Sequence, residues 1–442
     1  MRLLRRLRVS YLHLLGCCWL LLIWYGERTY PYHKIRDCDW PTIGTADTRI
    51  ALIADPQIID DNTYPGRNRV LLSVTKYIVD YYLRKNWVYI NDALDPDVNV
   101  FLGDLFDGGR EWKDKAWKEE FDRYNRIFTK PAFKRTIMSL PGNHDIGYGD
   151  TIVPHALNRF RAYFGETSST VGVGNHTLVI LDTISMLNTI NESIYGPPKE
   201  FMDNLAKTAG DPETKPRILL SHVPLYRDKD ASCGKYREAK KPLPYVKGYQ
   251  YQTLVTPELS QKILSAVNPI AVFSGDDHDA CHVQHPYKLN GQEKTTDEFT
   301  VKSISMAMGI EDPGIQLLTL GTSGAYETSI CFMPSPFYPF LLYGLFLAVT
   351  LANLTLFNLY PKHLPSWLLV LQKQPRIEEQ PNDALPMHYD REVKHFTDST
   401  AKSWKPYRPP TFDRKSLLRD VLILSVIAVP FFIYLSRSIY YT

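Results

Sequence analysis

The sequence lacks a strong excess of charge of either sign and has few cysteines. Its 51 Lys and Arg residues against 48 Asp and Glu residues leave a formal charge of +3 over 442 residues, which excludes a strongly basic nucleic-acid binder. The six cysteines show no CxxC spacing, and this excludes a disulfide scaffold or a cysteine-rich zinc module. Wholesale disorder is also excluded, because 44% of the residues are hydrophobic and can form a sizeable core.

The first hydrophobic run begins directly after a basic N-terminus. Residues 1–8 (MRLLRRLR) contain four arginines, and residues 9–25 are apolar, with tryptophan and tyrosine toward the far end. The small residues of a signal-peptidase site do not follow this run. We therefore predict an uncleaved signal anchor, at the short end for a bilayer span, with residues 1–8 in the cytoplasm by the positive-inside rule.

Two further apolar runs lie near the C-terminus. Residues 337–360 contain no charged residue and are long enough to cross a bilayer. Residues 417–436 are interrupted by Pro430, and we predict a third span there, with an interfacial helix as the alternative. Residues 361–415 hold ten Lys and Arg residues and many polar residues, so we predict a poorly ordered cytoplasmic linker. The tail, residues 437–442, is then luminal.

This topology places residues 27–335 in the lumen of the secretory pathway. Two sequences in this segment, beginning at Asn175 and Asn191, are glycosylation acceptors. Four cysteines lie on the oxidising side, where one or two disulfides can form, and the sequence leaves their pairing open: Cys38, Cys233, Cys281 and Cys331.

One pattern recurs in the luminal segment, namely a short apolar run that ends abruptly in a polar cluster. The clusters are DPQ (55–57), GDLFDGG (103–109), PGNHD (141–145), SHVPLYR (221–227) and SGDDHDAC (274–281). Such runs predict buried strands, and residues 67–85 and 111–130 between them are amphipathic and predict helices. We therefore expect an α/β sandwich with helices outside and with the polar clusters at one edge of the strands.

Each polar cluster taken alone is explained by a turn or a helix cap. Five clusters in order, each at a strand end and each rich in Asp, Asn or His, indicate a shared metal site instead. The clusters offer oxygen and imidazole donors, which suit divalent metal ions, and their acidic, amide and imidazole side chains include Asp55, Gln57, Asp104, Asp107, Asn143, His222, Asp276 and His278.

The ordered set D-x-x, GD, GNHD, H and GxxH resembles the calcineurin-like metallophosphoesterases over the whole luminal segment. The motifs IADPQ, GDLFDGGR, PGNHDIGYG, SHVPLYR and SGDDHDAC are similar to the membrane-bound branch that remodels glycosylphosphatidylinositol (GPI) anchors, and most similar to its fungal members. This resemblance implies a metallophosphoesterase-type β-sandwich flanked by helices, with about three transmembrane helices. It also implies a manganese-dependent phosphodiesterase that removes ethanolamine phosphate from an anchor mannose after the anchor has been attached to protein.

The same resemblance implies a role for each candidate residue. Asp55 and His278 would bind one metal ion, Asn143 and His222 a second, and Asp104 both. His144 would donate a proton or hydrogen bond to the leaving oxygen, and Asp145 would orient its ring. Two ions at such a site activate a water molecule and neutralise the phosphoryl oxygens.

Two positions depart from the superfamily pattern. Gln57 stands where a histidine is usual, and Asp276 replaces the first histidine of the last motif. Both changes replace nitrogen by oxygen, which favours manganese or magnesium over zinc. Three carboxylates against two divalent ions and a hydroxide leave little net charge, so we expect a preference for phosphodiester monoanions over phosphomonoester dianions. Asp107, Asp277 and Asp279 are candidates to receive the ammonium group of ethanolamine phosphate.

We therefore expect a multi-pass membrane protein of the endoplasmic reticulum, with the Golgi as the alternative, that supports export of GPI-anchored proteins. Its expected partners are GPI-anchored proteins as substrate, the lipid bilayer and the cargo-export machinery, and no nucleic acid. Two other functions fit the same residues. One is hydrolysis of another luminal phosphoester, because the metal ligands indicate the class of reaction and do not identify the alcohol of the ester that is cleaved. The other is a non-catalytic adaptor for GPI-anchored cargo.

Overall fold

The fold is described from a computed structural model, for residues 11–44, 47–241, 243–359 and 412–441. The chain divides into two compact units, one of Met1–Ile23 with Leu341–Ile433 and one of Trp24–Phe340 with Tyr434–Thr442. Residues 1–8 and most of the linker predicted at 361–415 lie outside the described residues.

The described residues of the first unit come from three helices: α1 (Tyr11–Trp24), α10 (Tyr338–Leu359) and α11 (Arg414–Ser438). Leu12, Leu354 and Leu424 form their shared apolar contact. Among the described residues, α10 and α11 are the helices that are long and apolar enough to cross a membrane. The 14 residues of α1 do not pass the same test of length, although helical backbone continues after them through residues 25–29 and 30–36. Two helices of the described residues are therefore candidate spans, and the expectation of about three is not confirmed.

The second unit contains two sheets and a small hairpin. The first sheet has the order β13-β12-β1-β2-β3 and the second β10-β11-β9-β6-β5-β4, while β7 and β8 pair alone. The strands of the first sheet are β1 (Thr48–Ile53), β2 (Val98–Phe101), β3 (Arg135–Ile137), β12 (Gly314–Leu320) and β13 (Tyr326–Phe332). Those of the second are β4 (Ser169–Val173), β5 (His176–Ile180), β6 (Arg217–Leu220), β9 (Pro269–Ser274), β10 (Cys281–Leu289) and β11 (Gln292–Thr300); the hairpin is β7 (Lys247–Gly248) and β8 (Tyr251–Gln252).

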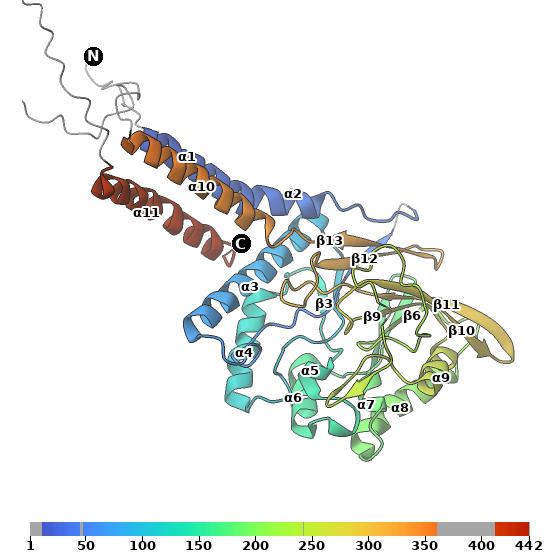
Figure 1. Ribbon diagram of the computed structural model, residues 1–442. Coiled ribbons are helices and arrows are strands. Elements are labelled where there is room, and N and C mark those ends of the chain that lie inside the picture. The colour runs from blue at the N-terminus through green and yellow to red at the C-terminus, as the bar shows by residue number, and fades with distance from the viewer. Residues whose placement is uncertain (1–10, 45–46, 242, 360–411, 442) are drawn as a thin grey trace, which may run out of the picture. The chain divides into compact units, whose positions relative to one another are not determined.

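The helices of this unit pack around the sheets (Figure 1). The α-helices are α2 (Tyr30–Arg36), α3 (Arg69–Tyr89), α4 (Asp114–Ile127), α5 (Asn143–Ile146), α6 (Pro154–Phe164), α7 (Thr183–Met186), α8 (Glu192–Ala206) and α9 (Pro257–Val267). Two π-helical turns, η1 (Tyr25–Thr29) and η2 (Ile90–Leu94), and the 3-10 turn η3 (Gly149–Thr151) complete the set. Side chains cap the N-termini of two of the longer helices. Asn68 accepts a hydrogen bond from a backbone amide in the first turn of α3, and Thr256 accepts one in the first turn of α9.

Alternation of side chains along the strands produces the sandwich. Ile50 and Leu52 of β1 join one buried cluster with Ile218 and Leu220 of β6, which fills the space between the two sheets. The intervening Ala51 belongs to a second cluster that includes side chains of the outer helices. Successive residues of a strand point to opposite faces, so the central strands of each sheet are buried on both sides, as the predicted α/β sandwich requires.

Strand direction brings the polar clusters to one edge. Strands β1, β2 and β3 are parallel to one another, and so are β5, β6, β9 and β11. Their carboxyl ends carry the clusters predicted at 55–57, 103–109, 141–145, 221–227 and 274–281. The polar residues that follow the strands of both sheets therefore lie at the same edge of the sandwich, where α/β proteins bind ligands.

Two disulfides settle the pairing that the sequence left open. Cys38 pairs with Cys331, which ties the segment before β1 to the edge strand β13. Cys233 pairs with Cys281 and holds the long loop after β6 against the start of β10.

Candidate active site

The centre of the site is a buried group of three side chains from three different strand ends. Asp55 follows β1, Asp104 follows β2 and His222 follows β6, and one ligand atom from each lies within 4.8 Å of the others. Nε2 of His222 is 3.5 Å from Oδ1 of Asp104 and also 3.5 Å from Oδ1 of Asp276. The backbone amide of Asp276 in turn donates to Oδ1 of Asp55 at 3.2 Å.

Several donor and acceptor atoms of this site are buried without a hydrogen-bond partner. Within the described chain these include Oδ2 of Asp55, Oε1 of Gln57, Oδ1 of Asn143 and Nε2 of His222. A buried polar atom without a partner is costly in free energy. Carboxylate oxygen, amide oxygen and imidazole nitrogen are metal ligands, so the side chains present fit divalent metal ions.

The backbone at the site adopts an unusual conformation. Asp55, Gln57, Asp104, Asp276 and His278 all have positive φ, between 35° and 64°. Residues other than glycine rarely adopt this region, at a cost of about 1–3 kcal/mol each, and such residues cluster at functional sites. The strand ends are therefore bent so that successive side chains turn toward the same centre.

Glycines allow the strand ends to approach one another closely. A Cβ atom on Gly142 would lie 1.9 Å from Oδ1 of Asp104, and one on Gly103 would lie 2.5 Å from Nδ1 of His222. Gly103 also has a φ of +96°, which other residues rarely adopt. These two positions accept only glycine if Asp104 and His222 are to keep their places.

The side chain that contacts His144 is Asp107, and not Asp145 as we expected. Nδ1 of His144 lies 2.6 Å from the carbonyl oxygen of Asp107 and 3.2 Å from its Oδ1. The Asp145 carboxylate instead accepts hydrogen bonds from the backbone amides of residues 105, 106 and 142. Asp145 therefore fixes the two loops that carry Asp104 and Asn143, because its position as the third residue of α5 directs its side chain to the helix start.

The carboxylates create a field that favours positive charge. Burial raises the pKa of Asp55 to about 7, although His278 and His222 oppose this shift. Burial also raises the pKa of Asp104, but the interactions with His222 and His144 together have the larger effect and hold this pKa below its usual range. Burial is the largest single influence on His144 and lowers its pKa, but the charge of Asp104 and the hydrogen bond and charge of Asp107 together outweigh burial and raise this pKa to about 9.

Three acidic residues proposed from the sequence to receive an ammonium group already have partners. Asp277 forms an ion pair with Arg237, and Asp279 accepts hydrogen bonds from Lys302 and from backbone amides. Asp107 accepts from Nε2 of Gln57 at 3.0 Å as well as contacting His144. Asp277 and Asp279 are thus already paired with cations of the protein, and the receptor for an ammonium group stays a prediction.

The sequence reasoning missed the hairpin of β7 and β8 beside the site. The carbonyl oxygen of Gln250 in its turn accepts a hydrogen bond from Nδ2 of Asn143 at 3.1 Å. Three tyrosines of this hairpin are exposed: Tyr245, Tyr249 and Tyr251. The density of tyrosine over residues 236–251 is the signal in the sequence that could have identified it.

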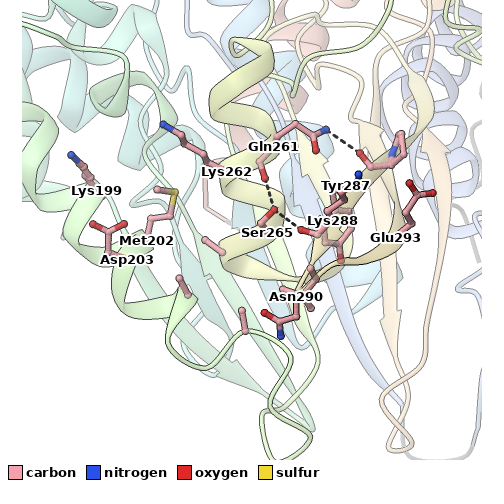
Figure 2. A pocket seen from close by; sticks show the side chains of 15 residues that line it. Lys199, Met202, Asp203, Gln261, Lys262, Ser265, Tyr287, Lys288, Asn290 and Glu293 are labelled. Atoms are coloured by element: carbon pink, nitrogen blue, oxygen red, sulfur yellow. Dashed lines mark hydrogen bonds between the residues drawn. The ribbon is translucent and has the colours of Figure 1, made fainter.

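A separate groove lies at the opposite edge of the second sheet. It has a volume of about 890 Å³ and is formed by α8, α9 and the turn between β10 and β11. Figure 2 shows Gln261 and Ser265 of α9 directed toward strand β10, where they donate hydrogen bonds to the carbonyl oxygens of Pro286 and Lys288. None of the predicted site residues lines the groove, so it is not part of the metal site.

The two predicted glycosylation acceptors lie on loops. Asn175 is exposed in the turn between β4 and β5, and its side chain donates to the carbonyl oxygen of Thr322. Asn191 is half-buried at the start of α8, where its side chain accepts from the amide of Ser193. Their glycosylation stays a prediction.

Comparison with known proteins gives the family. The sequence model of the calcineurin-like phosphoesterases matches residues 48–280. Cell division control protein 1 of Saccharomyces cerevisiae is 41% identical, over 97% of this chain and 91% of its own length. Metallophosphoesterase 1 of Danio rerio is 26% identical over 70% of this chain and 82% of its own length, and the Drosophila melanogaster homologue is 24% identical over 70% and 83%. The chain therefore belongs to the calcineurin-like metallophosphoesterases and is a metal-dependent phosphoesterase.

Proposed function

We propose that this enzyme is a luminal, manganese-dependent phosphodiesterase that removes ethanolamine phosphate from a mannose of the GPI glycan on anchored proteins. The observation that carries the proposal is the buried group Asp55, Asp104 and His222 with Asp276 beside it, because this donor set is rich in oxygen. Oxygen-rich sets favour manganese or magnesium. The membrane-bound, GPI-remodelling branch is the one that the motifs of this sequence resemble.

Two metal ions would be held by the residues named from the sequence, with Asp55 and His278 on one ion, Asn143 and His222 on the other, and Asp104 between them. When bound, such a pair activates water as the nucleophile and neutralises charge on the phosphoryl oxygens. The unpaired oxygen atoms of Asp55 and Asn143 support these roles.

His144 is the candidate proton donor to the leaving mannose oxygen. Its ring is partly exposed, with 28% of the side chain accessible, so it can reach a substrate. Asp107 fixes the Nδ1 side of the ring, which leaves Nε2 to face the reacting group. Burial lowers the pKa of His144, but Asp104 and Asp107 together raise it, which favours the protonated ring that a general acid requires.

Charge at the site favours a phosphodiester. Three carboxylates, those of Asp55, Asp104 and Asp276, surround His222 within the distances given above. They offset most of the positive charge that two divalent ions would bring, so a monoanionic diester is accepted more readily than a dianionic monoester.

The tyrosine hairpin supports a carbohydrate substrate. Tyr249 is 79% exposed, and Gln250 next to it is bonded to the candidate ligand Asn143. A tyrosine ring offers an apolar face to the C–H surface of a sugar and a hydroxyl group that can form hydrogen bonds. The hairpin therefore provides a wall for a glycan whose phosphate lies at the metal site.

A luminal location has independent support in the two disulfides, because such bonds persist in oxidising compartments. The helices α10 and α11 provide membrane attachment. We place the enzyme in the endoplasmic reticulum, with the Golgi as the alternative, and GPI-anchored proteins are its proposed partners.

The test is mass spectrometry of GPI glycans from cells in which the sole copy of the chain is native, Asn143→Ala or Asn204→Ala. Asn204 is exposed on α8, away from the site, and serves as the matched control. We expect an extra ethanolamine phosphate on one mannose in the Asn143→Ala strain alone. Identical glycans in all three strains would contradict the GPI substrate and favour another luminal phosphoester.

His144→Ala separates catalysis from an adaptor role. An enzyme loses turnover with this variant, whereas an adaptor keeps its effect on the export of anchored cargo. His155→Ala, at an exposed histidine on α6, is the control. Normal export and normal glycans with His144→Ala would favour the adaptor.

A further inference from the structure

A second cavity lies in the catalytic unit, away from the metal site. Its volume is about 640 Å³. Four stretches far apart in the sequence form it: the end of α1 with η1, the end of α3 with η2, the loop after α4, and the end of α11 with the residue that follows it. None of the predicted metal ligands lines it.

Two arginines line this cavity and differ in burial. Arg84 is only 3% exposed, whereas Arg28 is half-buried. Arg84 donates through Nε to the carbonyl oxygen of Ile439 and through Nη1 to Ile127 and Thr129. Arg28 donates through Nη2 to the carbonyl oxygen of Leu435 and to Ser438.

Part of this arrangement has a purely structural explanation. Leu435 and Ile439 lie at the C-terminal end of α11, where carbonyl oxygens attract cations. Capping does not use the whole of either guanidinium group, however. Nη1 of Arg28 is buried without a hydrogen-bond partner, and Nη2 of Arg84 has none within the described residues. Unused guanidinium N–H groups beside a cavity are suited to a phosphate, which arginine binds in a bidentate manner.

The charges around the cavity leave a positive excess. Arg28 and Arg84 face one exposed carboxylate among the lining residues, that of Asp92. The neighbouring Lys85 and Glu27 neutralise each other in a buried ion pair of 2.7 Å. An anion is therefore favoured, and a single negative charge is enough to balance the excess.

The remaining lining residues indicate that the anion belongs to a lipid. Trp24 ends α1 and is 50% exposed, and Tyr434 lies in the last turns of α11 and is 65% exposed. Tryptophan and tyrosine are enriched at the membrane–water interface. Because α11 is long and apolar enough to span a membrane, a cavity at its end lies at the depth of lipid headgroups.

We propose that this cavity binds the phosphate group of a membrane phospholipid through Arg28 and Arg84. The inference concerns membrane attachment and does not depend on the substrate proposed for the metal site. It assigns to the catalytic unit a lipid-binding site distinct from its catalytic centre.

The test uses the full-length protein, purified in detergent and freed of lipid, and measures binding by native mass spectrometry. The probes are a short-chain phosphatidylinositol, a diacylglycerol with the same chains, and inorganic phosphate. We expect the phospholipid to bind at least tenfold more tightly than either of the other two, because only it combines the charge with the apolar chains. Equal binding of diacylglycerol, or full binding by inorganic phosphate alone, would overturn the assignment to a phospholipid.

Two substitutions of residues that line the cavity change the net charge around it in opposite directions. Thr129→Glu adds a carboxylate beside Arg84 at an exposed position, and Asp92→Asn removes one. We expect phospholipid binding to weaken about tenfold with the first and to strengthen with the second. Thr170→Glu, on the exposed face of the edge strand β4, is the matched control. Unchanged thermal unfolding and unchanged hydrolysis of a soluble diester verify folding, and unaltered lipid binding by both wall variants would contradict the site.

Discussion

The imidazole of His144 is held by a single neighbouring residue, Asp107, through both its backbone and its side chain. Nδ1 of His144 lies 2.6 Å from the carbonyl oxygen and 3.2 Å from Oδ1 of Asp107. The same carboxylate accepts from Gln57 and Thr63, so its position is fixed from two further sides. Asp107 is therefore a positioning residue for the candidate proton donor.

Asp107→Asn should lower kcat by about 10- to 100-fold and leave KM nearly unchanged, because the ring loses orientation and charge support while substrate contacts remain. Steady-state kinetics on a phosphodiester measure both constants. Asp122→Asn, at an exposed residue of α4, is the control. A raised KM with unaltered kcat would show that Asp107 serves substrate binding instead.

Gly142→Ala should abolish activity with only moderate loss of stability. The new Cβ would lie 1.9 Å from Oδ1 and 2.4 Å from the backbone nitrogen of Asp104, so the Asp104 carboxylate must move. Gly172→Ala is the matched control, because no atom lies within 4 Å of its Cβ position. Metal affinity measured by calorimetry should fall for the first variant alone. Full metal binding by Gly142→Ala would contradict the placement of Asp104 in the metal site.

Glu298 should make the fold sensitive to acid. It is fully buried and bonded to Arg227, His285, Ser274 and a backbone amide. Burial raises its pKa, but Arg227 and His285 outweigh burial and hold the pKa below the usual value of 4.5. A group with a lowered folded-state pKa contributes stability that is fully present above its unfolded pKa and is lost as pH falls through the folded pKa.

Glu298→Gln should therefore lower the free energy of unfolding at pH 7 by about 3–5 kcal/mol, since it leaves Arg227 buried without its ion pair. It should also flatten the dependence of stability on pH below about 4.5. Denaturant unfolding between pH 3 and 7 measures both effects. Glu293→Gln, on the same strand but exposed, is the control. Parallel pH profiles for native protein and Glu298→Gln would refute this account.

Removal of the Cys38–Cys331 disulfide should destabilise the catalytic unit by about 2–5 kcal/mol, because the bond closes a long loop in the unfolded chain. The variant Cys38→Ser/Cys331→Ser is compared with Cys17→Ser/Cys18→Ser, which alters the two free cysteines. The melting temperature should fall for the Cys38→Ser/Cys331→Ser variant only. A reducing agent should lower the melting temperature of the native protein in the same way. An unshifted melting temperature would show that the bond does not constrain the fold.

Much of the fold could be predicted from short-range patterns. The runs after Arg49, Val98, Arg217 and Pro269 are strands β1, β2, β6 and β9, because apolar runs bounded by turn residues are buried on both faces. The strands β10 and β11 were missed because polar residues alternate along their exposed face, as in QEKTTDEFT. Their pairing depends on the tertiary contact with β9, which local sequence does not report.

The site could be predicted as a set of residues but not as a set of contacts. The clusters at strand ends identified Asp55, Asp104 and His222, which the parallel strands bring together. The partner of His144 depends on the local geometry of the loop after β2, so the resemblance, which assigned the orienting role to Asp145, did not indicate Asp107. The hairpin beside Asn143 comes from residues more than 100 positions away, and no local pattern connects the two.

The most direct test of the central claim is the product formed by the purified full-length enzyme from a GPI glycopeptide that carries ethanolamine phosphate on its mannoses. With Mn²⁺ the native protein should release ethanolamine phosphate and leave a free mannose hydroxyl, and His222→Ala should release none. Release of free ethanolamine, with the phosphate left on the mannose, would place cleavage at the wrong ester bond. No release by a protein that still hydrolyses other phosphodiesters would contradict the proposed substrate.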